Sequence, residues 1–198
     1  MIASECQRVR EDLYFWQAYE PAVKSDLSCC ARRFGSRLIF IDPIPLKEQA
    51  LNEVTVGAEP SVIILTNGNH ARAAAELRNR FSIPIHAHSG AVAELGLTVD
   101  WLLGESAEAS DLFDVVELPG GGPGEIALHA DGVMHVGDAL IHLESTGLAV
   151  LPAKYCSDVR LLRRSLGKLL RFDFEVLTFA HGLPLVSDAR RRLESLLA

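Results

Sequence analysis

The sequence predicts an α/β fold, and three observations lead to this prediction. Residues 62–65 (VIIL) form a short apolar run rich in β-branched side chains, which is typical of a strand buried on both faces. A polar loop, residues 66–70, interrupts this run, and the alanine-rich segment 71–81 that follows has the composition of a helix. Strand-like and helix-like segments alternate along the rest of the chain, as they do in α/β proteins.

The segments before this loop are predicted from their apolar patterns. Residues 13–19 form an aromatic-rich strand, residues 21–28 a loop, and residues 37–42 a second strand that ends in Asp42 before Pro43. An aspartate followed by proline favours the change from extended chain to turn. The segment 45–56 has apolar residues at helical spacing, which predicts a short helix.

The segment 83–88 (IPIHAH) predicts another strand, with His86 and His88 on the same face. Two imidazoles at this spacing can bind one metal ion. We favour the alternative, a half-exposed strand with both histidines on its solvent side, because two-histidine matches rarely extend to complete sites. Residues 89–95 predict a short helix with Ser89 as its N-cap.

The second half of the chain begins with short strands and acidic turns between residues 100 and 116. The glycine-rich run 118–124 fits neither the GxxxxGK[ST] nor the GxGxxG phosphate-binding pattern. Residues 125–129 and 133–136 predict a β-hairpin around Asp131-Gly132.

The C-terminal segments complete the alternation. Residues 157–171 predict an amphipathic helix with Ser157 as N-cap and a basic face, which we interpret as solvated rather than as a surface for an acidic partner. A last strand, residues 175–180, precedes His181-Gly182 and a terminal helix over residues 186–197.

Length and composition limit the classes of protein. A chain of 198 residues fits a single domain, residues 1–198, and its net charge of −7 argues against nucleic-acid binding. The four cysteines form no CxxC pair. No secretory h-region and no run long enough to span a bilayer is present, so we expect a cytoplasmic protein with neither a membrane nor a nucleic-acid partner.

Three segments resemble, in order and spacing, the signature segments of the metallo-β-lactamase superfamily. The loop 66–72 (TNGNHAR) matches Thr-His-x-His-x-Asp-His, residues 123–138 contain the Pro-Gly and Gly-Asp elements, and His181-Gly182 matches the closing turn. The resemblance spans nearly the whole chain. It implies a four-layer α/β/β/α sandwich with two mixed sheets face to face, and a strand ending in Asp42 that supports a metal-binding loop.

The same match implies that most metal ligands are replaced. The first metal would draw on Asn67, Asn69 and Gly121, and an amide oxygen is a poor zinc ligand. The second would draw on positions 71, 72, 138 and 181, of which Asp138 and His181 alone can bind a metal. A catalytic zinc needs about three protein ligands and an open position for water. Ala71 also lacks the carboxylate that orients the attacking water in the superfamily.

We therefore expect a degenerate member, a pseudoenzyme without a cofactor, whose pocket accepts a small polar or anionic ligand. The expected pocket residues are Asn67, Asn69, His70, Arg72, Gly121, Asp138 and His181. Because a guanidinium can satisfy a carboxylate with two hydrogen bonds, we expect Arg72 to pair with Asp138 in place of a metal. Otherwise Arg72 points to solvent.

The alternative is a divergent metal-dependent hydrolase of an ester, thioester or phosphoester. It would hold one zinc, iron or manganese ion with Asp138, His181 and His70. A metal-free hydrolase would need a nucleophile and a base, and the sequence contains no GxSxG elbow. A third alternative is a structural partner in an oligomer. The sequence indicates no substrate and no oligomeric state.

Overall fold

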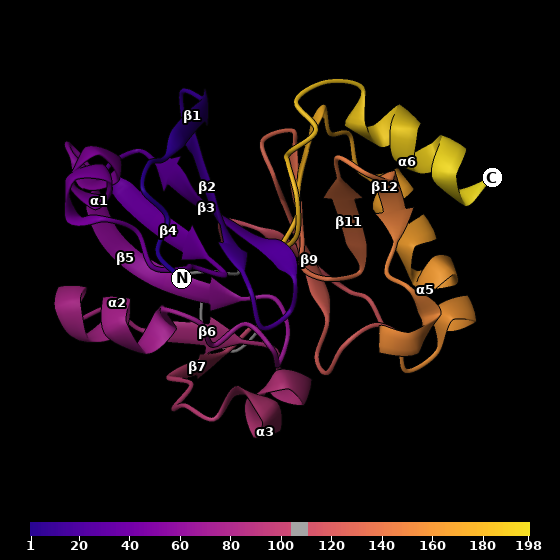
Figure 1. Ribbon diagram of the computed structural model, residues 1–198, viewed down its shortest axis with the longest axis horizontal. Coiled ribbons are helices and arrows are strands. Elements are labelled where there is room, and N and C mark those ends of the chain that lie inside the picture. Colours follow the sequence, from indigo (N-terminus) through magenta and orange to yellow (C-terminus); the bar gives the residue numbers. More distant parts are fainter. Residues whose placement is uncertain (104–110) are drawn as a thin grey trace.

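The structure, a computed structural model, describes residues 1–103 and 111–198. Two sheets pack face to face, and helices cover the outer face of each (Figure 1). The seven-stranded sheet contains, in spatial order, β1 (Gln7–Arg10), β2 (Leu13–Glu20), β3 (Ser25–Phe34), β4 (Arg37–Ile41), β5 (Glu59–Leu65), β6 (Ile85–Ala87) and β7 (Trp101–Leu102). Its first four strands are antiparallel, and β4 to β7 are parallel.

The second sheet belongs to the C-terminal half of the chain. Its strands, in spatial order, are β13 (Val176–Thr178), β10 (Val133–Val136), β9 (Ile126–Ala130) and β8 (Asp114–Glu117). A separate hairpin of β11 (Leu140–Leu143) and β12 (Gly147–Val150) lies beside this sheet.

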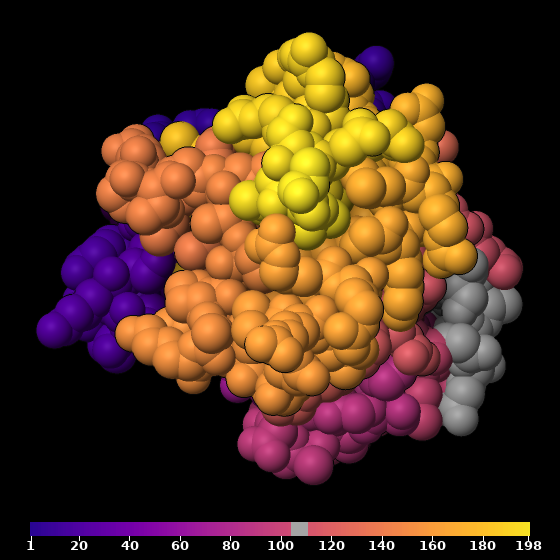
Figure 2. All heavy atoms as spheres, turned by 90° about the vertical axis from the view of Figure 1, so that its right-hand side faces the viewer, coloured from indigo at the N-terminus to yellow at the C-terminus, as the bar shows by residue number. Residues whose placement is uncertain are grey.

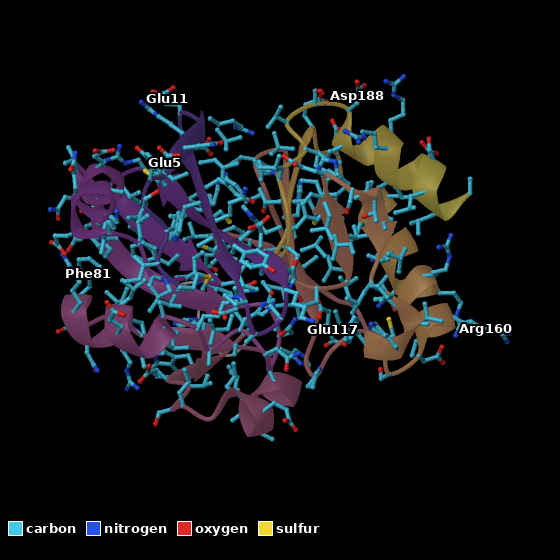
Figure 3. All side chains as sticks on the ribbon, in the orientation of Figure 1. Glu5, Glu11, Phe81, Glu117, Arg160 and Asp188 are labelled. Atoms are coloured by element: carbon cyan, nitrogen blue, oxygen red, sulfur yellow. The ribbon has the colours of Figure 1, made fainter. Side chains whose placement is uncertain are left out.

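Three apolar clusters hold the four layers together. In β4, Leu38 and Phe40 face outward to the helices α1 (Glu48–Thr55), α2 (Ala74–Phe81) and α3 (Val92–Leu95), which follows the 3-10 turn η1 (Ser89–Ala91). The alternate residues Ile39 and Ile41 face inward and contact the second sheet. This period of two is what a strand buried on both faces requires. Side chains fill the space between the sheets (Figure 3).

The helices of the C-terminal half cover the second sheet. They are α5 (Val159–Leu166), which continues into the 3-10 helix η3 (Gly167–Arg171), and α6 (Ala189–Leu197); a short 3-10 turn, η2 (Ala153–Tyr155), precedes them. Leu162, Leu166 and Leu193 are fully buried against the sheet. These helices form the orange and yellow face of the molecule in Figure 2, and Arg160 projects outward from it (Figure 3). Within the described ranges, no helix is long and apolar enough to cross a membrane.

The structure confirms the expected layered sandwich and most elements, and it corrects several boundaries. The loop prediction for residues 21–28 is wrong at its end, because β3 starts at Ser25. The helix expected over residues 71–81 starts at Ala74, because Arg72 has a positive φ of 34°. The N-caps are His88 and Asp158, one residue from the predicted serines 89 and 157. Residues 104–110, within the predicted run of short strands, lie outside the described residues.

Candidate functional site

Loops from both halves of the molecule meet at one end of the two sheets. Backbone hydrogen bonds join them: the amide of Gly68 donates to the carbonyl of Pro123 at 2.9 Å, and the amide of Ala180 donates to that of Gly137 at 3.2 Å. The segments that follow β4, β5 and β13 therefore lie beside the segments that precede β9 and follow β10. Ligand sites of α/β proteins commonly occupy such carboxyl ends of strands.

Asp42 fixes the loop that follows β5. Its Oδ1 accepts a hydrogen bond from the amide of Thr66 at 2.8 Å, and its Oδ2 accepts one from Thr66 Oγ1 at 2.5 Å. The carboxylate is buried, and its residue has a φ of 50°, which aspartate tolerates better than most residues. His70 Nδ1 lies 2.9 Å from the same Oδ2. Asp42 thus supports the loop, as expected from the resemblance.

His70 connects Asp42 to Asp138. Its Nε2 lies 3.1 Å from Asp138 Oδ1, and its side chain is 2% exposed. An imidazole that donates from both nitrogens must carry the positive charge. Burial works against the charged form, but Asp42 and then Asp138 outweigh burial and raise the pKa of His70 to about 9. At neutral pH an imidazolium therefore lies between two carboxylates.

The pKa values of the two carboxylates are lowered, whereas the pKa of His70 is raised. Burial favours the neutral form of Asp138, but His70 and His181 hold its pKa well below the ordinary value. The same competition between burial and His70 lowers the pKa of Asp42. His181 Nε2 lies 3.3 Å from Asp138 Oδ1, and its Nδ1 donates to the carbonyl of Asp26 at 3.0 Å. We call Asp42, His70, Asp138 and His181 the His70 network.

A second buried group, which the sequence analysis did not identify, lies where the first metal was expected. Glu125 Oε2 accepts a hydrogen bond from Asn67 Nδ2 at 2.9 Å, and its Oε1 accepts one from the amide of Ala139 at 3.0 Å. A Cβ on Gly121 would lie 3.0 Å from Glu125 Cγ, so the glycine leaves room for this side chain. Burial and then the charge of Asp138 raise the pKa of Glu125 to about 7.

The position of Glu125 gave a usable signal in the sequence. It directly follows the matched Pro-Gly pair, so it had to lie near the expected ligand position. Its pairing with Asn67, however, joins residues 58 positions apart and depends on how the two sheets dock.

The predicted pairing of Arg72 with Asp138 is wrong. The Arg72 guanidinium donates to backbone carbonyls instead: Nη1 to Ser28 at 2.8 Å and to Asp42 at 3.2 Å, and Nη2 to Ala180 at 3.4 Å. The alternative, that Arg72 points to solvent, is also wrong. His70, rather than Arg72, supplies the positive charge beside Asp138.

The remaining predicted residues are placed as follows. Asn69 is exposed, and its amide donates to Asn67 Oδ1 at 2.8 Å. His86 is fully buried in β6, so the prediction of two solvent-facing histidines holds for His88 alone. In the part of the chain that the structure describes, no three His, Cys, Asp or Glu side chains are arranged to hold a metal ion. Asp138 and the two imidazoles meet as hydrogen-bond partners through one carboxylate oxygen.

A cavity of about 300 Å³ opens on the His181 side of this network. The residue after His181, Gly182, lines it, as do Ser25 and Asp26, which both contact the His181 ring. The opposite wall comes from β11 and the turn after it. Neither the His70 network nor the other residues of the expected pocket are among the residues that line this cavity, which adjoins the network through the neighbours of His181.

Comparison with known families and proteins gives two findings. A family model described as the metallo-beta-lactamase superfamily matches residues 7–198. No curated protein matches the sequence.

Solved structures resemble this fold over its whole length. DIM-1 metallo-β-lactamase exposed to ceftazidime matches with a TM-score of 0.78 at 14% identity, over 100% of this chain and 97% of that one. The enzyme from Erythrobacter litoralis with β-mercaptoethanol in its active site gives 0.75 at 13% identity, over 97% and 95%. FIM-1 from Pseudomonas aeruginosa in its mono-zinc form gives 0.73 at 13% identity, over 100% and 94%. At these identities the likeness concerns the fold alone.

Proposed function

Because this chain belongs to the metallo-β-lactamase superfamily, we propose that it is a non-catalytic member in which the His70 network has replaced the dinuclear metal centre. It acts as a binding protein for a small polar ligand. We further propose that it works in the cytoplasm without nucleic acid or membrane. The observation that carries the proposal is the burial of the His70 side chain between Asp42 and Asp138, with its two ring nitrogens 2.9 and 3.1 Å from their carboxylate oxygens.

The charge of His70 supports the loss of the second metal. A divalent cation held by Asp138 would lie within a few ångströms of this imidazolium, and like charges repel strongly in a poorly solvated site. The positions that matched the other ligands of this metal carry Ala71 and Arg72, and Arg72 is engaged by three carbonyls. The donor set of this chain does not fit a metal there as long as His70 is charged.

The Asn67–Glu125 pair supports the loss of the first metal. Asn67 presents a neutral amide, Gly121 has no side chain, and the space beside it is filled by Glu125. Amide oxygens bind zinc weakly compared with imidazole or carboxylate. Without a metal, a water molecule in this pocket keeps a high pKa and is a poor nucleophile.

One observation favours the alternative, a metal-dependent hydrolase of an ester, thioester or phosphoester. The Nε2 atoms of His70 and His181 lie 3.1 and 3.3 Å from the same oxygen of Asp138. Donor atoms around a tetrahedral zinc ion are also separated by about 3.3 Å, given bonds of about 2.0 Å. Loss of the ring protons that face Asp138 would leave three donor atoms near one another, and the side chains would still have to rearrange before zinc, iron or manganese could bind, because no three described side chains are arranged to hold a metal ion.

Elemental analysis tests the proposal against this alternative. The chain is purified without chelator, incubated with zinc, iron(II) or manganese, and freed of excess metal; Asp138→Asn is treated in parallel. We expect substoichiometric metal that is the same in both proteins. In addition, ¹⁵N NMR at pH 7 should show both His70 nitrogens protonated. Stoichiometric metal that is lost in Asp138→Asn would establish the metal-dependent alternative instead.

A further inference from the structure

The C-terminal helices carry a basic face in an otherwise acidic protein. Residues 151–198 contain nine basic and five acidic side chains, a net charge of +4, whereas residues 1–150 contain ten and twenty-one, a net charge of −11. Eight of the nine basic side chains belong to α5, η3 and α6, the helices seen face-on in Figure 2. Charge separated in this way along a chain favours an acidic partner for the basic face.

Several of these cations have no partner in the protein. The exposed guanidiniums of Arg160 and Arg164 on α5 and of Arg192 on α6 form neither an ion pair nor a hydrogen bond within residues 1–103 and 111–198. Arg160 and Arg164 are one helical turn apart, so they lie on the same side of α5. A free guanidinium offers a fork of N–H donors that matches a carboxylate.

The two helices present these cations on a continuous surface. Arg163 Nη2 of α5 donates a hydrogen bond to the carbonyl of Leu196 in the last turn of α6 at 3.0 Å. Arg192 lies one turn before Leu196 on the same helix. The free guanidiniums of α5 and α6 therefore belong to neighbouring parts of one surface, which we call the α5–α6 face.

An open groove of about 520 Å³ adjoins this face. It lies between β12 and α6 and is lined by Leu148, Arg191, Arg192, Ser195 and Leu196. Leu148 and Leu196 are half-buried and pack on the core beneath them. Arg191 is paired with Asp188 at 2.9 Å, which leaves Arg192 as the free cation of this lining. The groove thus combines apolar walls with an uncompensated positive charge.

From this combination we propose that the α5–α6 face binds an acidic segment of a partner protein that also carries aliphatic side chains. Its carboxylates pair with Arg160, Arg164 and Arg192, and an aliphatic side chain occupies the groove. Exposed ion pairs are individually weak, so several pairs and the burial of apolar surface must act together. This inference goes beyond the proposed function, and it replaces the interpretation of the basic face as merely solvated.

Other polyanions fit this face less well. α5, η3 and α6 contain no aromatic side chain that could stack on the bases of a single-stranded nucleic acid. Leu162, Leu166 and Leu193 are buried against the sheet, so they cannot insert into a membrane. A second copy of the chain has the same net charge of −7, which opposes self-association.

Three fluorescein-labelled peptides separate charge from apolar contact. The first is built from alternating pairs of glutamate and leucine, the second has glutamine in place of glutamate, and the third has serine in place of leucine. Each is titrated with the full chain at physiological ionic strength and followed by fluorescence anisotropy. We expect the first peptide to bind roughly tenfold more tightly than either of the others. Absence of binding by the first, or equal binding of the second or third, would overturn the inference.

Arginine variants locate the binding surface. Arg164→Gln and Arg192→Gln should each weaken binding of the glutamate–leucine peptide roughly threefold, and the triple variant that adds Arg160→Gln should weaken it roughly tenfold or more. Arg8→Gln is the matched control, because Arg8 is exposed on β1 of the first sheet and its loss also removes one positive charge. If Arg8→Gln weakens binding as much as Arg192→Gln, the effect is one of net charge and the inference fails.

¹H–¹⁵N NMR shows whether each variant is folded and where the peptide binds. Shifts confined to α5, α6 and β12 would support the inference, and shifts confined to other elements would refute it. Duplex DNA and phosphatidylserine vesicles are titrated in parallel; tighter binding of either one than of the peptide would assign the face to another class of partner. Elemental analysis of the chain decides the proposed function separately, because the α5–α6 face contains no member of the His70 network.

Discussion

Replacing His70 with glutamine removes the imidazolium while keeping a polar side chain of similar length. The pKa of His70 rises from 6.5 to about 9 on folding, and its side chain is 2% exposed, so solvent screens it little. Because a tenfold change in a protonation equilibrium corresponds to about 1.4 kcal/mol, the charge of His70 contributes about 3 kcal/mol to the free energy of unfolding at neutral pH. We expect His70→Gln to lose about that amount at pH 7.

The pH dependence of the stability loss in His70→Gln distinguishes the effect of the His70 charge from the effect of its packing. For a group whose pKa is raised on folding, the stabilisation is fully present below pH 6.5 and disappears as the pH rises through about 9. The difference in free energy of unfolding between the native chain and His70→Gln should therefore shrink by about 3 kcal/mol between pH 6 and pH 10. The charge of His70 lowers the pKa of Glu125, so both proteins are compared in a Glu125→Gln background, which removes the titration of Glu125 from this difference.

Urea unfolding followed by tryptophan fluorescence measures these free energies. Trp16 is 1% exposed, and its indole donates to the carbonyl of Ile44, so its emission reports unfolding of the first sheet. His129→Gln is the control, because His129 also joins a carboxylate, Asp114, to a carbonyl, but at the surface. It should cost less than about 1 kcal/mol. If His70→Gln lowers the free energy of unfolding by the same amount at pH 6 and pH 10, His70 does not carry the stabilising charge.

Three further predictions concern stability and thiol reactivity. Gly182→Ala should cost more than about 2 kcal/mol in urea unfolding, because Gly182 has a φ of 94° and a Cβ there would overlap the carbonyl of His142. Gly121→Ala should cost about 1–3 kcal/mol, and this cost should fall in a Glu125→Ala background, since the new Cβ would lie 3.0 Å from Glu125 Cγ. In thiol titrations of the native protein with DTNB, the two partly exposed cysteines should react and the two buried ones should not; these are Cys6 and Cys156, and Cys29 and Cys30. Burial raises the pKa of the Cys30 thiol to about 12.

Matched variants and denatured samples serve as controls. At Gly147, φ is also positive and nothing lies within 4 Å of an added Cβ, so Gly147→Ala should lower the free energy of unfolding less than Gly182→Ala does. Equal losses would contradict the overlap at Gly182. Gly167→Ala, also in open space, is the control for Gly121→Ala. An unchanged cost in the Glu125→Ala background would mean that the side chain does not occupy that space. All four thiols should react in urea, and rapid reaction of all four in the native state would contradict the burial of Cys29 and Cys30.

Strands with a strong local pattern could be predicted from the sequence. The apolar run of β5 and the Asp-Gly turn between β9 and β10 depend on neighbouring residues, and both were found where expected. The start of β3 was missed because Ser25, Asp26 and Ser28 are typical of loops. Their strand conformation depends on pairing with β2 and, for Ser28, on a buried hydrogen bond to Gly182.

The sequence predicted which loops form the site but not which side chains bond to one another there. The order of the matched segments indicated which loops converge, and Asp138 and His181 do lie together. The partners of His70 and Arg72 were not predictable, because they lie in or just after strands far away in the sequence. Arg72 adopts a positive φ that turns its side chain to the carbonyls, and no local pattern of residues signals that turn.

The carboxylates that flank His70 come from opposite halves of the chain. Asp42 follows a strand of the first sheet, while Asp138 follows a strand of the second, so the imidazolium gains its full stabilisation only after the sheets have docked. An interaction completed so late is absent from most of the folding transition state. Alkaline solutions should accordingly accelerate unfolding and leave the refolding rate nearly unchanged. Protonation of His70 would thus slow the unfolding of the assembled molecule.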